Sequence, residues 1–205
     1  MKTTKHRLKQ ILLNAAILSC VGLYSCDDDD APEAENEVEA ITSVTLTFTP
    51  QGGGTPAIAS AVDADGLGPG NFTQLLTPEL EPGTTYDLTM SLLDARDPSD
   101  IEDIGEEVEE EDDEHQFYFF VTGSIFTADG SDIPGTVYQD TDDNNLPVGL
   151  ETTWTTSASA ASGEFRVILR HQPDEKNQAS ATDRAVGITT GDEDFDFTFD
   201  INIGS

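Results

Sequence analysis

Residues 194–203 read Asp-Phe-Asp-Phe-Thr-Phe-Asp-Ile-Asn-Ile, so an apolar side chain occupies every second position. Side chains of a β-strand point alternately to opposite faces, and this period therefore predicts a strand with one buried and one solvent-facing side. Residues 44–48, 86–92 and 165–169 alternate in the same way. Strands of parallel sheets carry continuous apolar runs instead, so the sequence favours antiparallel sheets.

Turn-forming segments separate the alternating stretches, among them Gly52-Gly53-Gly54, Asp129-Gly130 and Asn144-Asn145. Short strands punctuated by such turns are typical of sandwiches. We expect an all-β, immunoglobulin-like or fibronectin III-like antiparallel β-sandwich, forming a single domain over residues 41–205. The expected core comprises Val44, Leu46, Phe48, Tyr86, Leu88, Phe117, Phe119, Phe165, Val167, Phe197 and Phe199.

Residues 80–88 read Leu-Glu-Pro-Gly-Thr-Thr-Tyr-Asp-Leu. They resemble the corner of fibronectin type III and related immunoglobulin-like domains, in which a tyrosine hydroxyl bonds back to the turn. One short acidic helix is expected over residues 99–112, with Ser99 as its cap and Glu102 completing a capping box. The strand that follows, His115 to Val121, is apolar on both faces, which predicts a central position in its sheet.

The N-terminus has the features of a lipoprotein signal peptide. Basic residues at positions 2–9 precede a 13-residue apolar run, Ile11 to Leu23, and Ser25 precedes Cys26. The run is too short to span a bilayer, which needs about 20 apolar residues. We expect residues 1–25 to be removed, Cys26 to carry lipid and residues 26–40 to form an acidic, disordered tether. Cys20 is a weaker alternative because cleavage there would shorten the apolar run.

Four aspartates, Asp27, Asp28, Asp29 and Asp30, follow Cys26. Such a cluster resembles the export signal of Bacteroidetes surface lipoproteins, which implies the outer face of the outer membrane; retention at the inner membrane is the alternative. After the signal, five Lys and Arg against 41 Asp and Glu leave a net charge of −36. A surface of that sign repels nucleic acid, so we expect no nucleic-acid partner.

Four stretches resemble a known group of proteins. Residues 42–54, 106–119, 146–150 and 169–173 are similar to small flavobacterial lipoproteins commonly labelled type 1 periplasmic binding fold superfamily proteins. A true type 1 binding protein has two α/β lobes, and this chain has neither their length nor their alternation of strands and helices. The resemblance therefore implies an envelope lipoprotein, and the expected fold stays the sandwich.

Two histidines form the first candidate site. His115 opens the strand 115–121 and His171 closes the strand 163–171, so antiparallel pairing of these strands would bring the imidazoles together. With Asp113 or Glu114 they would offer two nitrogens and a carboxylate, a set that suits zinc, copper or iron. Acidic neighbours are expected to raise the pKa values of both imidazoles. The alternative is two polar residues at strand ends without a metal.

A second candidate site is the segment 140–151. Asp140, Asp142, Asn144 and Glu151 occupy positions 1, 3, 5 and 12 of a calcium-loop spacing, with Asn145 where EF-hands have glycine. A hairpin loop rich in turn formers explains the same residues.

No nucleophile elbow, zincin pair or phosphate loop occurs in the sequence, so no enzyme is expected. We expect a non-catalytic, lipid-anchored and surface-exposed binding module that captures a cation or small solute for an outer-membrane transporter, such as a TonB-dependent receptor. The alternative is a structural or adhesive envelope lipoprotein without a small ligand.

Overall fold

The computed structural model describes residues 39–63, 65–66, 71–130 and 137–204. All of them belong to one compact unit of the chain. Cys26, Asp27 to Asp30 and the predicted signal peptide lie outside the described residues. Among the described residues, no helix has the length and apolar character needed to cross a membrane.

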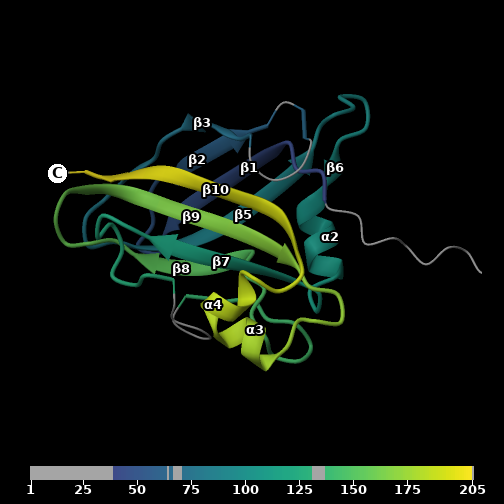
Figure 1. Ribbon diagram of the computed structural model, residues 1–205. Coiled ribbons are helices and arrows are strands. Elements are labelled where there is room, and N and C mark those ends of the chain that lie inside the picture. The colour runs from purple at the N-terminus through teal and green to yellow at the C-terminus, as the bar shows by residue number, and fades with distance from the viewer. Residues whose placement is uncertain (1–38, 64, 67–70, 131–136, 205) are drawn as a thin grey trace, which may run out of the picture. The chain divides into compact units, whose positions relative to one another are not determined.

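Two β-sheets pack face to face as a sandwich, which confirms the predicted fold class (Figure 1). The first sheet has the order β3-β2-β1-β5-β6, and β8 pairs with β5. Its strands are β1 (Ser43–Pro50), β2 (Ala57–Val62), β3 (Thr73–Leu76), β5 (Thr85–Asp94), β6 (Glu102–Asp103) and β8 (Glu151–Thr155). All of its strand pairs are antiparallel, as the alternating sequence predicted.

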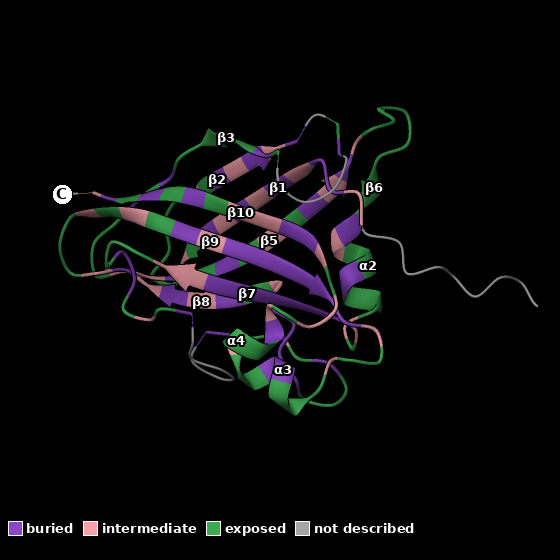
Figure 2. Cartoon of the chain, viewed as in Figure 1, coloured by how far each residue is buried: buried purple, intermediate pink, exposed green. Residues whose placement is uncertain are grey.

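The second sheet has the order β4-β10-β9-β7. It consists of β4 (Glu79–Leu80), β7 (His115–Val121), β9 (Ala161–His171) and β10 (Asp192–Ile203). Only β4 and β10 run parallel to each other. The two longest strands, β9 and β10, form the middle of this sheet and bury one face against the first sheet (Figure 2).

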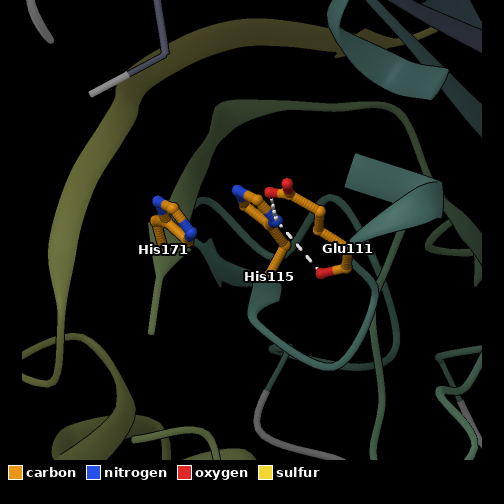
Figure 3. Close-up of side chains that lie close together, drawn as sticks. All are labelled: Glu111, His115 and His171. Atoms are coloured by element: carbon orange, nitrogen blue, oxygen red, sulfur yellow. Dashed lines mark hydrogen bonds and ion pairs between the residues drawn. The ribbon is translucent and has the colours of Figure 1, made fainter. Parts of the chain in front are cut away.

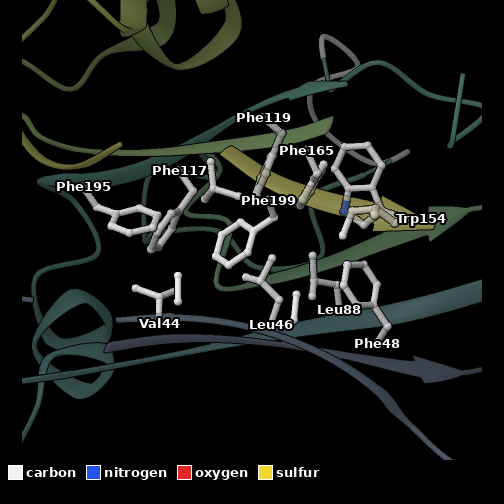
Figure 4. Close-up of a cluster of buried hydrophobic side chains, with 14 of the residues drawn as sticks. Val44, Leu46, Phe48, Leu88, Phe117, Phe119, Trp154, Phe165, Phe195 and Phe199 are labelled. Carbon is white, nitrogen blue, oxygen red and sulfur yellow. The ribbon is translucent and has the colours of Figure 1, made fainter. Parts of the chain in front are cut away.

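Aromatic rings fill the space between the sheets. Phe165 stacks on Phe119 at 5.5 Å between ring centroids, and Trp154 meets Phe165 edge to face at 5.0 Å (Figure 4). Such pairs stabilise a core beyond the burial of their area. Of the predicted core, every residue is buried except Phe197, which is only partly buried at the margin of the cluster.

The tyrosine corner predicted before β5 is confirmed. The backbone N–H of Glu81 donates to the Tyr86 hydroxyl at 2.9 Å, and the Tyr86 ring is buried. The Glu81 carbonyl in turn accepts from the Thr156 hydroxyl at 2.7 Å. The turn is thereby tied both to its own strand and to the end of β8.

In the part of the chain that the structure describes, three short helices lie at the rim of the sandwich (Figure 1). They are α2 (Ile104–Glu110), α3 (Gln178–Thr182) and α4 (Arg184–Gly187). The acidic helix is shorter than predicted, because Asp103 rather than Ser99 caps it and residues 102–103 pair with β5. Ser99 instead bonds to the side chain of Asp97.

The prediction that strand 115–121 is central was wrong. β7 lies at the end of its sheet, and its burial on both faces has another cause. Gln116 and Tyr118 donate from its outer face to the carbonyls of Ala181 and Ser180 in α3, at 3.2 and 3.1 Å. Along its edge, the Phe117 N–H donates to the Val148 carbonyl at 2.7 Å. Helices and a loop therefore cover this strand in place of another strand.

Candidate metal centre

The antiparallel register of β7 and β9 places His115 directly opposite His171, as predicted from their strand positions. The two imidazoles stack with 4.3 Å between ring centroids and 9° between their planes (Figure 3). Both residues are buried. The sequence-based expectation that these rings meet at one rim of the sandwich is therefore confirmed.

A third residue, Glu111, comes from the C-terminal end of α2. Among the described residues, Glu111, His115 and His171 are the only group of three or more His, Cys, Asp and Glu whose ligand atoms all lie within 4.8 Å of one another. The Glu111 carboxylate lies 3.9 Å from His115 Nδ1, and its side chain is 53% exposed. It thus marks the solvent side of a site whose nitrogens are inside.

The carboxylate in this group is not one of the two predicted. Asp113 is exposed and outside the group. Glu114 does contact the site, because its carboxylate lies 3.2 Å from His171 Nε2, but on the far nitrogen of that ring. The reason is local: the chain leaves α2 through a turn in which the N–H groups of Glu114 and His115 both donate to the Glu111 carbonyl.

Each imidazole has one nitrogen bonded to an acceptor and one nitrogen free. His115 Nδ1 lies 3.1 Å from the Glu111 carbonyl oxygen, and His171 Nε2 lies 3.2 Å from the Glu114 carboxylate. Because both partners are acceptors, these nitrogens carry the protons. His115 Nε2 and His171 Nδ1 then hold lone pairs, and both are buried without a hydrogen-bond partner. Metal-binding histidines are commonly held by this arrangement.

Asp194 is a buried carboxylate beside His115 that the sequence analysis did not identify. Its Oδ2 lies 3.8 Å from His115 Nε2 and has no hydrogen-bond partner, and both side chains are fully buried. The register of β10 against β9 shifts between Glu193 and Phe195, and Asp194 is the extra residue of this bulge. Bulges turn a side chain away from its normal alternation, which here directs an aspartate inward beside Phe195.

Burial sets the protonation of these groups. Desolvation, strengthened by the neighbouring His171, lowers the pKa of His115 to about 4. The expectation that acidic neighbours raise the pKa was therefore wrong for His115, because the loss of hydration outweighs the nearby carboxylates. Burial also raises the pKa of Asp194 to about 6. At neutral pH His115 is thus a neutral ligand that needs to lose no proton to bind a cation.

The predicted calcium loop does not gather its carboxylates around a common point. Asp140 accepts from the N–H groups of Gly149 and Glu151 at 2.9 and 3.1 Å. Asp142 accepts from two other amides of the loop, and its second oxygen lies 3.1 Å from Lys176 Nζ. Asn144 and Glu151 are exposed. Asp142 is therefore paired with a lysine ammonium instead of facing the other predicted ligands, and the hairpin interpretation accounts for the segment.

Comparison of the chain with protein-family models, with curated proteins and with solved structures gives no match.

Proposed function

We propose that this protein is a non-catalytic metal-binding module of the cell envelope that takes up a zinc-type ion at His115 and His171. The observation that carries the proposal is the pair of buried, unpartnered ring nitrogens, each on a ring whose other nitrogen is fixed by an acceptor. An unpaired buried nitrogen costs free energy that a bound cation would recover. Ordinary packing at the end of a strand does not require two buried ring nitrogens without hydrogen-bond partners.

The ligand set fits a borderline-soft ion. Two imidazole nitrogens and the buried Asp194 carboxylate beside His115 Nε2 supply three ligands of a tetrahedral zinc site. Glu111, on the solvent side, supplies the fourth once its carboxylate moves from His115 Nδ1 toward the ion. Nitrogen ligands disfavour calcium and magnesium, which bind oxygen. Glu114 and the Glu111 carbonyl would act from outside the coordination sphere by orienting the rings.

Binding must rearrange the rings. A lone pair lies in the plane of its imidazole, so two rings stacked 9° from parallel direct their lone pairs side by side and not toward one point. One ring therefore has to turn about its side-chain torsions before both nitrogens reach the 2.0–2.1 Å or so of a zinc–nitrogen bond. Loss of the stack is thus a structural signature of the proposed site.

Zinc titration of the purified, chelator-stripped protein tests the proposal. We expect one ion per chain, a change in the histidine ring resonances, and no binding by the His115→Ala, His171→Ala double variant. Glu114→Gln should weaken binding by about 10–100-fold, as loss of a ligand-orienting partner does. Glu111→Gln should also weaken it, whereas Glu110→Gln, which removes the same charge from an adjacent exposed position, should not. Equal zinc affinity in wild type and double variant contradicts the proposal.

The proposal also includes the location of the protein in the cell envelope. The signal sequence supports anchoring by lipid at Cys26 and exposure at the cell surface, where a captured ion could pass to an outer-membrane transporter of the TonB-dependent kind. A strongly acidic surface favours this role, because it raises the local concentration of cations.

A further inference from the structure

Lys176 is the only lysine between residues 10 and 205, in a chain with 41 acidic residues. Its side chain does not face solvent. Its side chain is fully buried against the equally buried side chain of Asp142, with Nζ 3.1 Å from Oδ2. Nζ also donates to the Asp112 carbonyl. Burial of an ion pair costs free energy that its attraction recovers only in good geometry, so this placement calls for an explanation.

Asp142 is held in a form that suits attack by a nucleophile. Its Oδ1 accepts from the backbone N–H groups of Asn144 and Leu146, both at 2.8 Å, while Oδ2 faces the lysine. The loop around it is closed by the bond from Asp142 N–H to the Leu146 carbonyl. Two fixed amides on one carboxyl oxygen stabilise the negative charge that develops there when the carbon becomes tetrahedral.

We propose that Lys176 and Asp142 condense in the folded protein to form an intramolecular amide bond between Nζ and Cγ. The ammonium first passes a proton to Oδ2, which gives a neutral amine and a carboxylic acid. The nitrogen lone pair then forms the bond to Cγ, the bond from Cγ to Oδ2 breaks, and that oxygen leaves as water with two hydrogens of the original ammonium. The step needs no oxidant, reductant or activated co-reactant.

The surroundings favour this step. Burial lowers the pKa of Lys176, because the charged ammonium loses its hydration, and so increases the share of the reactive neutral amine. The fold holds the two groups in contact, which replaces a bimolecular encounter by an intramolecular one. The bond would join the loop that follows Asp140 to the turn that follows His171. The chain has only two cysteines, Cys20 and Cys26, both in the N-terminal 26 residues, so a cross-link of the folded domain has to use other chemistry.

Mass spectrometry of the denatured protein decides between a bond and an ion pair. Wild type should be lighter by one water than its sequence requires, measured against the Lys176→Arg variant, which keeps the charge but cannot form the amide. Trypsin should release peptide 97–166 joined to peptide 171–184, uncut after Lys176 because an acylated lysine is not a trypsin site. In denaturant, Lys176 should not react with an amine-specific reagent.

Asp143→Ala provides the matched control, because Asp143 is exposed beside Asp142 and its loss should leave the cross-linked peptide unchanged. The cross-link also has to be told apart from a cyclic imide at an Asp-Gly pair, which loses one water as well. The branched peptide, absent from Lys176→Arg, makes that distinction. Full mass and a reactive Lys176 in wild type would overturn the proposal and leave an ordinary buried ion pair, whatever the zinc titration shows.

Discussion

At the scale of single residues, the acidic side chains near His115 differ sharply in how much water they keep. Asp194 is buried, and Glu39 donates its backbone N–H to Asp194 Oδ1 at 3.3 Å. Burial, together with the adjacent carboxylate of Glu107, raises the pKa of Glu39 to about 8. Glu39 therefore holds a proton at neutral pH, and this proton lets it share a hydrogen bond with Glu107 instead of repelling it.

We expect the metal-free protein to lose stability as pH rises from 6.5 to above 8. The folded state keeps the Glu39 proton up to a pKa of about 8, whereas the unfolded chain releases it near 4.5. The folded state thus binds more protons in this window, and its stability falls with pH. The lowered pKa of His115 has the opposite effect, but only between about 4 and 6.5. The raised pKa of Asp194, about 6, acts in the same direction as that of Glu39, but mainly below this window.

Denaturant unfolding in the presence of a chelator, at pH 6.5 and 8.5, measures this dependence. Glu39→Gln should reduce the difference in unfolding free energy between the two pH values, because the amide keeps a neutral hydrogen-bonding group at both. Glu110→Gln should leave the slope as in wild type. An unchanged slope in Glu39→Gln would assign the pH dependence to other groups.

The residues of the site differed in how far the sequence could predict them. The pairing of His115 with His171 followed from strand ends, since His115 opens the strand 115–121, His171 closes the strand 163–171, and antiparallel pairing brings those two ends together. The choice of Glu111 depended on where α2 ends within a uniform acidic run, and no residue type marks that point. Asp194 lies inward only because of a bulge, and Lys176 reaches Asp142 only through tertiary packing. Local sequence patterns predict neither the inward position of Asp194 nor the contact between Lys176 and Asp142.

At the scale of elements, β7 shows how a terminal strand is protected. Exposed strand edges invite unwanted pairing, and coverage by a helix or loop prevents it. Here the loop at Val148 covers the edge of β7, and α4 packs on the outer face so closely that a Cβ built on Gly187 would come within 2.3 Å of the Tyr118 ring. That ring is fixed, because its hydroxyl bonds to the Ser180 carbonyl and to the Gln172 amide, at 3.1 and 3.2 Å.

Gly187→Ala should therefore destabilise the fold. Helix propensity alone favours alanine over glycine by up to about 1 kcal/mol. Overpacking against a ring that cannot move costs about 1–3 kcal/mol, so we expect a net loss of stability. Urea unfolding gives the value, with Gly52→Ala as control, since a Cβ at Gly52 meets nothing within 4 Å. A Gly187→Ala protein as stable as wild type would show that α4 does not pack tightly on β7.

Strands were easier to predict than helices for a physical reason. A period of two repeated over five or more residues is a strong signal, and β1, β5, β9 and β10 all carry it. Helices α3 and α4 have five and four residues, too few to show a helical period. Phe197 marks the limit of the strand signal, because alternation identifies the inward face but not how completely each side chain on it is covered: Phe195 and Phe199 are buried, and Phe197 is only partly buried.

At the scale of the whole molecule, the proposed metal binding and the proposed cellular location depend on different parts of the chain. The proposed metal centre uses residues of the sandwich, while the proposed location at the cell surface rests on Cys26 and the aspartates after it. The mature net charge of −36 follows from the count of acids along the whole chain. That charge is spread over the whole chain, whereas the four aspartates directly follow Cys26, so we expect the proposed export signal to depend on where the acids lie and not on their number.

Cys26→Ala should release the protein from membranes in soluble form, because the acyl chains supply the anchor. Replacing Asp27 to Asp30 with alanine should keep the protein on the membrane but protect it from protease added to intact cells. The control replaces four exposed acids at positions 102, 106, 109 and 110 with glutamine, which removes the same charge from the rim of the sandwich and should leave protease access unchanged. Equal digestion of the aspartate variant and wild type would show that these four residues do not direct export, and a loss of access in the control would make net charge the signal instead of position.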